Sequence, residues 1–321
     1  MNALAALAAA LSFVGRQGTL LAALSIFIGL AAPQLAAFLK PWLGMVIVGM
    51  LTLAFLRVDP VRLRRYYTRP GLIAASTVWL MLVAPALMGI AFAHAGIAEA
   101  APGLYFMLVI QLAAPGLMSA PAVAALLGLD VALSLAALIV SIAVAPISAG
   151  LFTHLFLGTA LASPLALGLR LALIIAGAAL GATVIRRIAG GAFIEAQAQR
   201  IDGLSVLMFM SFAIAAMDGV SAHIAHEPML VAKLTLLAFA LSLGMTAVTT
   251  LVFWPAGRAR ALAIGLLAGN RNMGLMLTAT GFAVPDLAWL YFAVAQFPIY
   301  LLPHLMRPLA RWATRVRSND R

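Results

Sequence analysis

An arginine stands between two asparagines in the middle of an apolar segment that is long enough to cross a bilayer. The segment covers residues 261–280, and Gly269 and Gly274 flank its polar centre, Asn270, Arg271 and Asn272. An arginine at the bilayer centre costs about 2.5–3.5 kcal/mol even on the lenient insertion scale. Backbone that leaves helical pairing at that depth must line a cavity or be buried in protein. We therefore expect a discontinuous helix whose break carries polar groups.

Composition places the rest of the chain in the membrane as well. Hydrophobic residues make up 65% of the 321 residues and charged residues only 9%, against roughly 25% charged in soluble domains. Because a span needs about 20 apolar residues, we expect an all-α polytopic membrane protein with ten transmembrane helices. The predicted spans lie near residues 17–38, 41–57, 70–94, 103–127, 130–157, 165–187, 202–222, 228–255, 260–281 and 285–309.

The positive charges predict the orientation. With ten spans both termini share one side, and sixteen of the 20 Lys and Arg residues then fall on that side, which the positive-inside rule makes the cytoplasm. They are Arg16, Arg57, Arg62, Arg64, Arg65, Arg69, Arg186, Arg187, Arg200, Arg258, Arg260, Arg307, Arg311, Arg315, Arg317 and Arg321. The net charge of +11 does not indicate nucleic-acid binding, because these residues lie between apolar runs, where they meet lipid headgroups.

The spans divide the chain into six segments. An N-terminal apolar interfacial segment (1–16) precedes a first five-span repeat (17–157). The second repeat starts with span 6 (158–185) and continues, after a cytoplasmic connector (186–201), through spans 7–10 (202–309) to a basic cytoplasmic tail (310–321). Because each repeat has an odd number of spans, the two insert with opposite orientation and form inverted repeats.

The fourth span of each repeat is interrupted near its middle. In the second repeat the interruption surrounds Arg271, and in the first the polar and helix-breaking residues are Gln111, Pro115, Gly116, Ser119 and Pro121. Proline removes a backbone donor and disfavours helix in the preceding turn. We predict crossed, discontinuous helices 4 and 9, with unwound backbone at residues 114–120 facing the break in span 9. Two ordinary kinked helices are the alternative.

These features resemble the bile acid:sodium symporter family, within the wider group of bile acid, arsenite and auxin carriers. The short sequence motifs that carry the resemblance are Gly-Leu-Ala-Ala-Pro (29–33), Leu-Lys-Pro (39–41), Ala-Pro-Gly (114–116), Leu-Asp-Val-Ala-Leu-Ser (129–134), Ala-Pro (145–146) and Gly-Asn-Arg-Asn-Met-Gly-Leu (269–275). They cover nearly the whole chain from about residue 17. The resemblance implies a carrier of the bacterial inner membrane, with a panel of spans 1, 2, 6 and 7 that moves against a core of spans 3–5 and 8–10.

The sequence departs from that family at the positions that hold sodium. The symporters have a glutamate and a glutamine on the ninth span, where this chain has Leu267 and Arg271. They have a Ser-Asn pair on the fourth span, where this chain has Ala120 and Pro121. Hard cations take oxygen ligands, so we do not expect sodium coupling through these sites. Asn272 matches the family's asparagine and still offers an amide.

The expected substrate-binding or cation-substituting residues are Arg271, Asn270, Asn272, Gln111 and Ser119. Arginine keeps its charge, and its planar guanidinium can hold a carboxylate or sulfonate through two charge-assisted hydrogen bonds. Arg271 would neutralise the substrate anion or lock the crossing of the two helices. The alternative is that it only ties the helices together through backbone carbonyls. Gln111 and Ser119 are equally compatible with facing the cavity and with forming interhelical hydrogen bonds.

The predicted function is a secondary transporter that moves a small organic anion, a carboxylate or sulfonate, by alternating access. A sodium- or proton-coupled symporter with other ligands is one alternative, and a membrane receptor, sensor or enzyme that binds an anionic ligand is another. The sequence has no cysteine and no recognisable catalytic motif, so we expect no enzyme, metal or cofactor. The expected partners are the organic anion and the lipid bilayer, without nucleic acid, and a monomer is compatible with the sequence.

Overall fold

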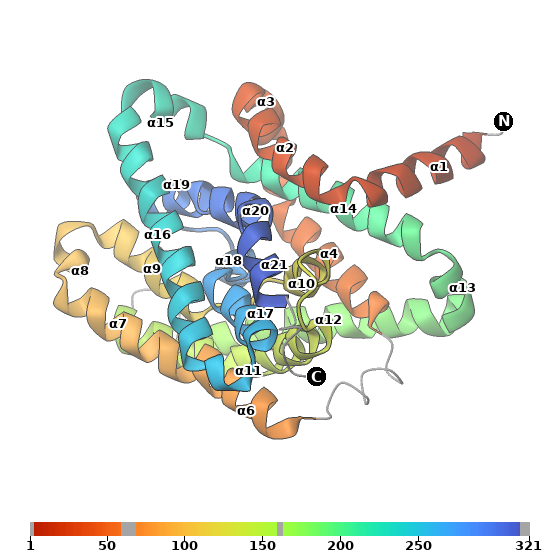
Figure 1. Ribbon diagram of the computed structural model, residues 1–321. Helices are drawn as coiled ribbons and strands as arrows, with labels where there is room; N and C mark the ends of the chain where they lie inside the picture. The colour runs from red at the N-terminus through yellow and green to blue at the C-terminus, as the bar shows by residue number, and fades with distance from the viewer. Residues whose placement is uncertain (1–2, 59–68, 159–162, 315–321) are drawn as a thin grey trace.

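The computed structural model describes residues 3–58, 69–158 and 163–314, which form helices and no β-strand (Figure 1). Six helices are long and apolar enough to cross a membrane, and two bent helix pairs raise the number to as many as eight. The six are Pro33–Arg57, Pro70–His94, Val131–Leu157, Pro164–Ala189, Ala198–His226 and Pro228–Val252. The chain is therefore an all-α, multi-pass membrane protein, as its composition predicts. Arg62, Arg64, Arg65, Arg315, Arg317 and Arg321, expected on the cytoplasmic side, lie outside the described residues.

The helices follow one another with short connections. Up to residue 157 they are α1 (Ala3–Arg16), α2 (Gly18–Ala31), α3 (Pro33–Leu39), η1 (Lys40–Trp42), α4 (Leu43–Arg57), α6 (Pro70–Val78), η2 (Trp79–Val83), α7 (Ala84–His94), α8 (Ile97–Ala100), α9 (Pro102–Ala113), α10 (Ala120–Leu126) and α11 (Val131–Leu157). The remainder are α12 (Pro164–Ala189), α13 (Gly191–Ala196), α14 (Ala198–Ala216), α15 (Val220–His226), α16 (Pro228–Val252), η3 (Trp254–Ala256), α17 (Arg258–Gly269), α18 (Met273–Thr280), α19 (Asp286–Val294), α20 (Gln296–Leu305) and α21 (Arg307–Thr314).

The first long helix begins earlier than the sequence predicts. We expected a boundary between residues 38 and 41, but the chain breaks at Ala32, which is extended at φ −125° and ψ 69°. The residue before a proline is pushed out of the helical region, and Pro33 follows Ala32. Pro41 lies at the start of a 3₁₀ turn, where its missing N–H is tolerated. As a result, α3, η1 and α4 run together as one helix of 25 residues.

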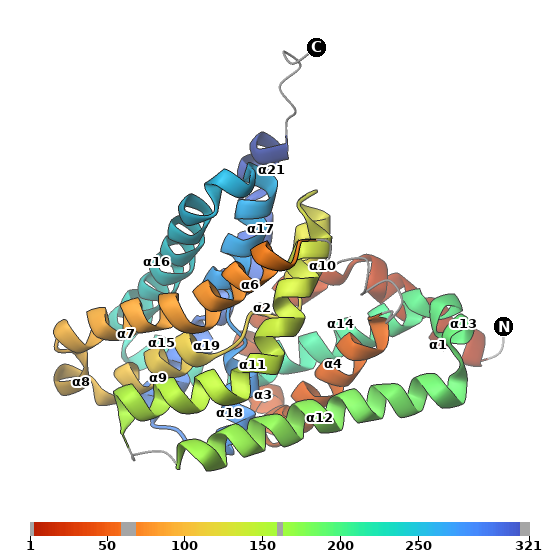
Figure 2. The same cartoon turned by 90° about the horizontal axis from the view of Figure 1, so that it is seen from below.

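The helices form two groups that lie side by side (Figure 1, Figure 2). In one group α14 packs against α1, α2, α3 and α4, and α4 also packs against α12. In the other, α11 packs against both interrupted segments, α9–α10 and α17–α18, and α16 packs against α17. The largest cluster of buried apolar side chains contains residues from both groups. The interrupted segments are therefore held inside protein along much of their length.

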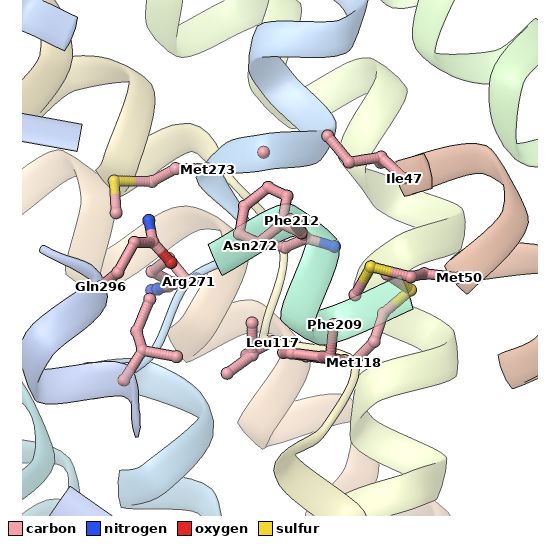
Figure 3. Close-up of a pocket in the computed structure, with 12 residues that line it drawn as sticks. Ile47, Met50, Leu117, Met118, Phe209, Phe212, Arg271, Asn272, Met273 and Gln296 are labelled. Atoms are coloured by element: carbon pink, nitrogen blue, oxygen red, sulfur yellow. The ribbon is translucent and has the colours of Figure 1, made fainter. Parts of the chain in front are cut away.

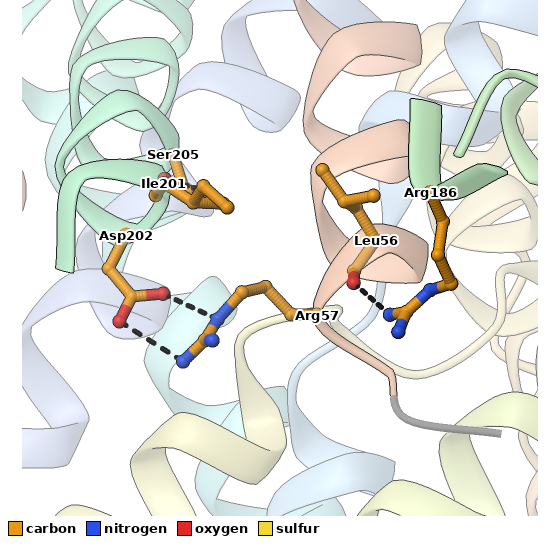
Figure 4. A network of polar contacts seen from close by, with 6 residues as sticks. All are labelled: Leu56, Arg57, Arg186, Ile201, Asp202 and Ser205. Atoms are coloured by element: carbon orange, nitrogen blue, oxygen red, sulfur yellow. Dashed lines mark hydrogen bonds and ion pairs between the residues drawn. The ribbon is translucent and has the colours of Figure 1, made fainter. Parts of the chain in front are cut away.

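Polar contacts hold α4, α12 and α14 together at one end (Figure 4). Arg57 at the end of α4 forms an ion pair with Asp202 of α14, with 2.8 Å between Nε and Oδ1. Arg186 of α12 donates to the carbonyl oxygens of Leu56 and Val58, the latter at 2.8 Å. The last carbonyls of a helix have no partner within it, and Arg186 supplies one at the end of α4. The three helix ends are thus fixed to one another.

Glycines let α17 lie close against α16. A Cβ atom added at Gly269 would stand 2.1 Å from Oγ1 of Thr246 and 2.3 Å from the carbonyl oxygen of Ser242. One added at Gly265 would stand 2.3 Å from Oγ1 of Thr250. In membranes, small residues at such contacts allow two helix backbones to approach and pack. The close contact with α16 fixes the end of α17, two residues before Arg271.

Candidate functional site

The breaks in the two interrupted segments pair with each other through their backbones. The first lies between Ala113, where α9 ends, and Ala120, where α10 begins, and the second lies between α17 and α18. The N–H of Leu117 donates to the carbonyl of Asn270, and the N–H of Asn272 donates to the carbonyl of Pro115, each at 2.9 Å. These bonds make an isolated antiparallel bridge between Gly116 and Arg271. The unwound backbone that the prolines and glycines predict is therefore satisfied by the opposite break.

Arg271 is buried in this bridge, with 3% of its surface exposed. Its guanidinium donates to three backbone carbonyls: Nε to Ala268 at 3.0 Å, Nη1 to Ala114 at 3.1 Å, and Nη2 to Leu80 at 2.9 Å. Ala268 is near the end of α17, and Ala114 is the first extended residue after α9. The guanidinium therefore joins three segments that are far apart in the sequence.

The third carbonyl is free because of a wide turn in the helix Pro70–His94. Residues 79–83 form a π-helical turn, η2, in which the N–H of Ala84 donates to Trp79 rather than to Leu80. The next residue in a position to donate to Leu80 is Pro85, which has no N–H. The carbonyl of Leu80 thus has no partner in its own helix and accepts from Arg271. Such π-turns are often found at functional sites.

The two asparagines beside Arg271 have different surroundings. Asn270 donates from Nδ2 to the carbonyl of Leu266 at 3.0 Å, back along α17. Asn272 caps α18, because its Oδ1 accepts from the N–H of Leu275 at 3.2 Å. Its Nδ2 is buried and has no hydrogen-bond partner. Asn272 lines the cavity beside the bridge and Asn270 does not.

This cavity has a volume of about 20 Å³ and lies between the two helix groups. Figure 3 shows Ile47 and Met50 of α4 across it from Met273 and Gln296. Further apolar walls come from Phe209 and Phe212 of α14 and from Leu117, Met118 and Ile299, and the polar lining comes from Arg271, Asn272 and Gln296. The space is enough for about one water molecule.

Gln111 and Ser119, expected near the substrate, do not line this cavity. The side chain of Gln111 accepts a hydrogen bond of 2.7 Å at Oε1 from the hydroxyl of Tyr291 in α19, so it forms the interhelical bond that we considered as an alternative. Ser119 is half-buried at the N-cap of α10 and makes no capping bond there.

Apart from Arg271, the positions at which the resembling symporters hold sodium are apolar in this structure. Leu267 is completely buried on α17, and its Cδ2 approaches Gly116. Ala120 and Pro121 form the first turn of α10. Among the described residues, no three His, Asp or Glu side chains come together in a way that could hold a metal ion.

The sequence did not indicate the apolar walls of the cavity. Ile47, Met50, Phe209 and Phe212 look like any lipid-facing residues of a span, and only the structure separates the two kinds. Pro85, a proline inside an apolar segment, is the sequence signal for the π-turn.

In comparisons with known proteins, the chain matches no protein-family model and no curated protein sequence.

Proposed function

We propose that the chain is a secondary transporter that moves a small organic anion, a carboxylate or sulfonate, across the bacterial inner membrane by alternating access. The observation that carries the proposal is the fixed cation of Arg271 at the paired breaks of two apolar helical segments. Discontinuous helices that meet in the membrane form substrate and ion sites in many transporters. A purely structural crossing would not require a charge that is expensive to bury.

Arg271 takes the place of a mobile cation in this proposal. The three carbonyl oxygens around its guanidinium are ligands of the kind that a hard cation would take. In the resembling family the same position is a glutamine that helps to hold sodium. In this chain the positive charge thus belongs to a side chain rather than to a bound ion, and transport does not require sodium. This role includes the structural tie between the breaks, since the tie is what holds the charge in place.

Asn272 is the proposed hydrogen-bond donor to the substrate. Its Nδ2 has no partner in the protein, and its side chain lines the cavity together with Arg271. A buried donor without a partner is unfavourable by about 1–3 kcal/mol, and a carboxylate or sulfonate oxygen would remove that penalty. Three of the five N–H donors of Arg271 bind backbone carbonyls. In the proposal the guanidinium keeps these three hydrogen bonds while its positive charge attracts the anion. The apolar walls suit the organic part of the substrate.

Access to this site requires the two helix groups to separate. At about 20 Å³ the cavity is too small for an organic anion, and residues of α4 and α14 close one side of it. In the proposed topology these helices belong to the panel of spans 1, 2, 6 and 7. The proposed ten spans are the six long helices, the two interrupted segments and one helix from each bent pair, Leu20–Ala31 and Asp286–Pro303. Separation of the panel from the core on alternate sides of the membrane would expose Asn272 to each side in turn.

The two helix groups also contact each other at the end of the molecule that is proposed to face outward, away from the ion pair of Arg57 and Asp202. Lys40 forms an ion pair of 2.8 Å with Asp218, and both are on the side of the proposed panel. Trp289 of α19 donates from Nε1 to the carbonyl of Asp218, and its ring lies 4.3 Å from Nζ of Lys40. Opening of the outer side would break these contacts, which makes them part of the conformational cycle that we propose.

The test has two stages, because the substrate is not identified. A thermal-shift screen of carboxylates and sulfonates in detergent first finds anions that raise Tm. Uptake of the best anion is then measured in proteoliposomes, in sodium and in choline buffers, for the native protein, Arg271→Gln and the exposed control Arg187→Gln. We expect equal uptake in both buffers and loss of uptake in Arg271→Gln alone. A strict sodium requirement, or full uptake by a folded Arg271→Gln, would contradict the proposal. Binding without flux would favour a receptor, and release of a chemically changed product would indicate an enzyme.

A further inference from the structure

Two neighbouring tryptophans both contact one arginine where the first residue of α17 meets the last helix, α21. The guanidinium carbon of Arg258 lies 5.8 Å from the ring centroid of Trp254 and 4.7 Å from that of Trp312. The two indole rings are 5.7 Å apart and inclined by 32°. Trp254 and Trp312 remain 40% and 44% exposed, so the cluster lies at the surface of the protein. We call these three residues the Trp–Arg–Trp cluster.

The helix that contributes Trp312 has one buried and one exposed side. Ala310 and Ala313 of α21 are buried in a cluster with residues of α17. Arg307, Arg311 and Leu309 are exposed together with Trp312. A short helix with basic and aromatic residues outside, bent by 45° from the preceding apolar helix, is typical of a segment that lies at the membrane surface.

The positive charges of this surface have no carboxylate partner among the described residues. In the residues that the structure describes, the basic members of the ion pairs are Lys40, Arg57, His223 and Arg260. None of these pairs involves Arg258, Arg307 or Arg311. Cation–π contact orients Arg258 but does not neutralise it. Arg258 thus carries a charge without a carboxylate partner against the two indoles, and the exposed Arg307 and Arg311 add two more on the helix that carries Trp312.

We propose that the Trp–Arg–Trp cluster and the exposed side of α21 bind the headgroup of an anionic phospholipid. A phosphodiester oxygen pair matches the planar fork of arginine, and indole rings favour the depth of the headgroups. Lipid bound there would bridge α21 and the first residue of α17, the helix that ends at the break with Arg271. The inference concerns the membrane surface, and it does not require the proposed substrate or the mode of transport.

The test counts lipid on the purified protein in detergent by native mass spectrometry. The probes are dioleoyl phosphatidylglycerol and dioleoyl phosphatidylcholine, which share acyl chains and differ in headgroup charge. We expect tighter binding of phosphatidylglycerol, and a loss of roughly fivefold in that preference for each of Arg258→Gln and Arg311→Gln. Arg187→Gln, which removes an exposed arginine of α12 without a described cation–π contact, should keep the preference.

Two results would overturn the proposal. One is equal binding of the two lipids by the native protein, and the other is an undiminished preference in Arg311→Gln. Arg311 is exposed, and no side-chain hydrogen bond or ion pair of it is described, so this variant remains informative even if Arg258→Gln does not fold. Because lipid is counted on the protein at rest, the outcome is separate from whether anion flux is found.

Discussion

The guanidinium of Arg271 and the carbonyl of Ala114, 157 positions apart in the chain, are joined by a hydrogen bond of 3.1 Å. The bond crosses from one interrupted segment to the other, at the point where neither backbone is helical. A side chain that carries charge is thus bonded to the backbone of the opposite break. Any movement that separates the breaks must also remove a buried cation from its carbonyl ligands.

Arg271→Lys should fold less stably than the native protein although it keeps the charge. An ammonium group has no planar fork and cannot reach three carbonyls from the same position, and each carbonyl left without a partner costs about 1–3 kcal/mol. We expect a lower Tm in detergent, with no such change for Arg187→Lys on the exposed side of α12. An unaltered Tm for Arg271→Lys would show that the three bonds are not what stabilises the crossing.

Pro85→Ala should separate stability from transport. The new N–H can donate to Leu80, which favours capture of that carbonyl by its own helix and weakens one bond to Arg271. Because proline inside a helix is itself unfavourable by about 3 kcal/mol, we expect Tm to stay or rise while anion uptake falls. Pro228→Ala is the control, since Pro228 starts α16, where an N–H has no helical partner. Unchanged uptake by Pro85→Ala would count against a role for the π-turn.

Gly269→Ala should destabilise the protein by about 1–3 kcal/mol, the usual effect of inserting a methyl group into a closely packed contact. The added Cβ would meet Thr246 and the backbone of Ser242 at distances that force α16 and α17 apart. Gly244→Ala, on α16, has no neighbour within 4 Å and should be neutral or slightly stabilising. Thermal unfolding in detergent measures both. Equal Tm values would mean that the helices can move apart at no cost.

The proposed orientation can be tested by cysteine labelling, because the chain has no cysteine of its own. Glu99 and Gln199 are both exposed and lie in connections predicted to face opposite sides of the membrane. In intact right-side-out cells, a membrane-impermeant maleimide should label Glu99→Cys and leave Gln199→Cys unlabelled until the cells are opened. Labelling in the reverse order would overturn the orientation derived from the basic residues.

The sequence predicted the interruptions of the helices better than the contacts between the helices. Pro115, Gly116 and Gly269 have local backbone effects, so the interruption of both segments could be inferred without knowing the fold. The same reasoning misplaced the first boundary, because Pro33 and Pro41 look alike in sequence and only one of them breaks the helix. The register of the two breaks, with Gly116 opposite Arg271, depends on packing between distant segments.

The composition of the cavity could not be predicted for a different reason. In a soluble protein, an apolar residue indicates the inside and a polar residue the outside. In this chain both the lipid-facing and the cavity-facing residues are apolar, so Phe212 at the cavity and Leu236 at the exposed surface carry the same signal. Polar residues were informative only where the membrane makes them expensive, as at Arg271 and Asn272.

A tethered cation changes the electrical balance of the proposed cycle. When sodium accompanies a substrate, its charge crosses with the anion, whereas the charge of Arg271 stays with the protein. If the anion is the only mobile charge, each turnover moves net negative charge across the bilayer. A negative-inside membrane potential then opposes entry of a monovalent anion by about 2.3 kcal/mol per 100 mV and drives its exit by the same amount. If the proposed function holds, a fixed arginine charge in place of sodium makes uniport of the anion electrogenic and favours efflux, whereas one-for-one exchange of equally charged anions would be independent of the membrane potential.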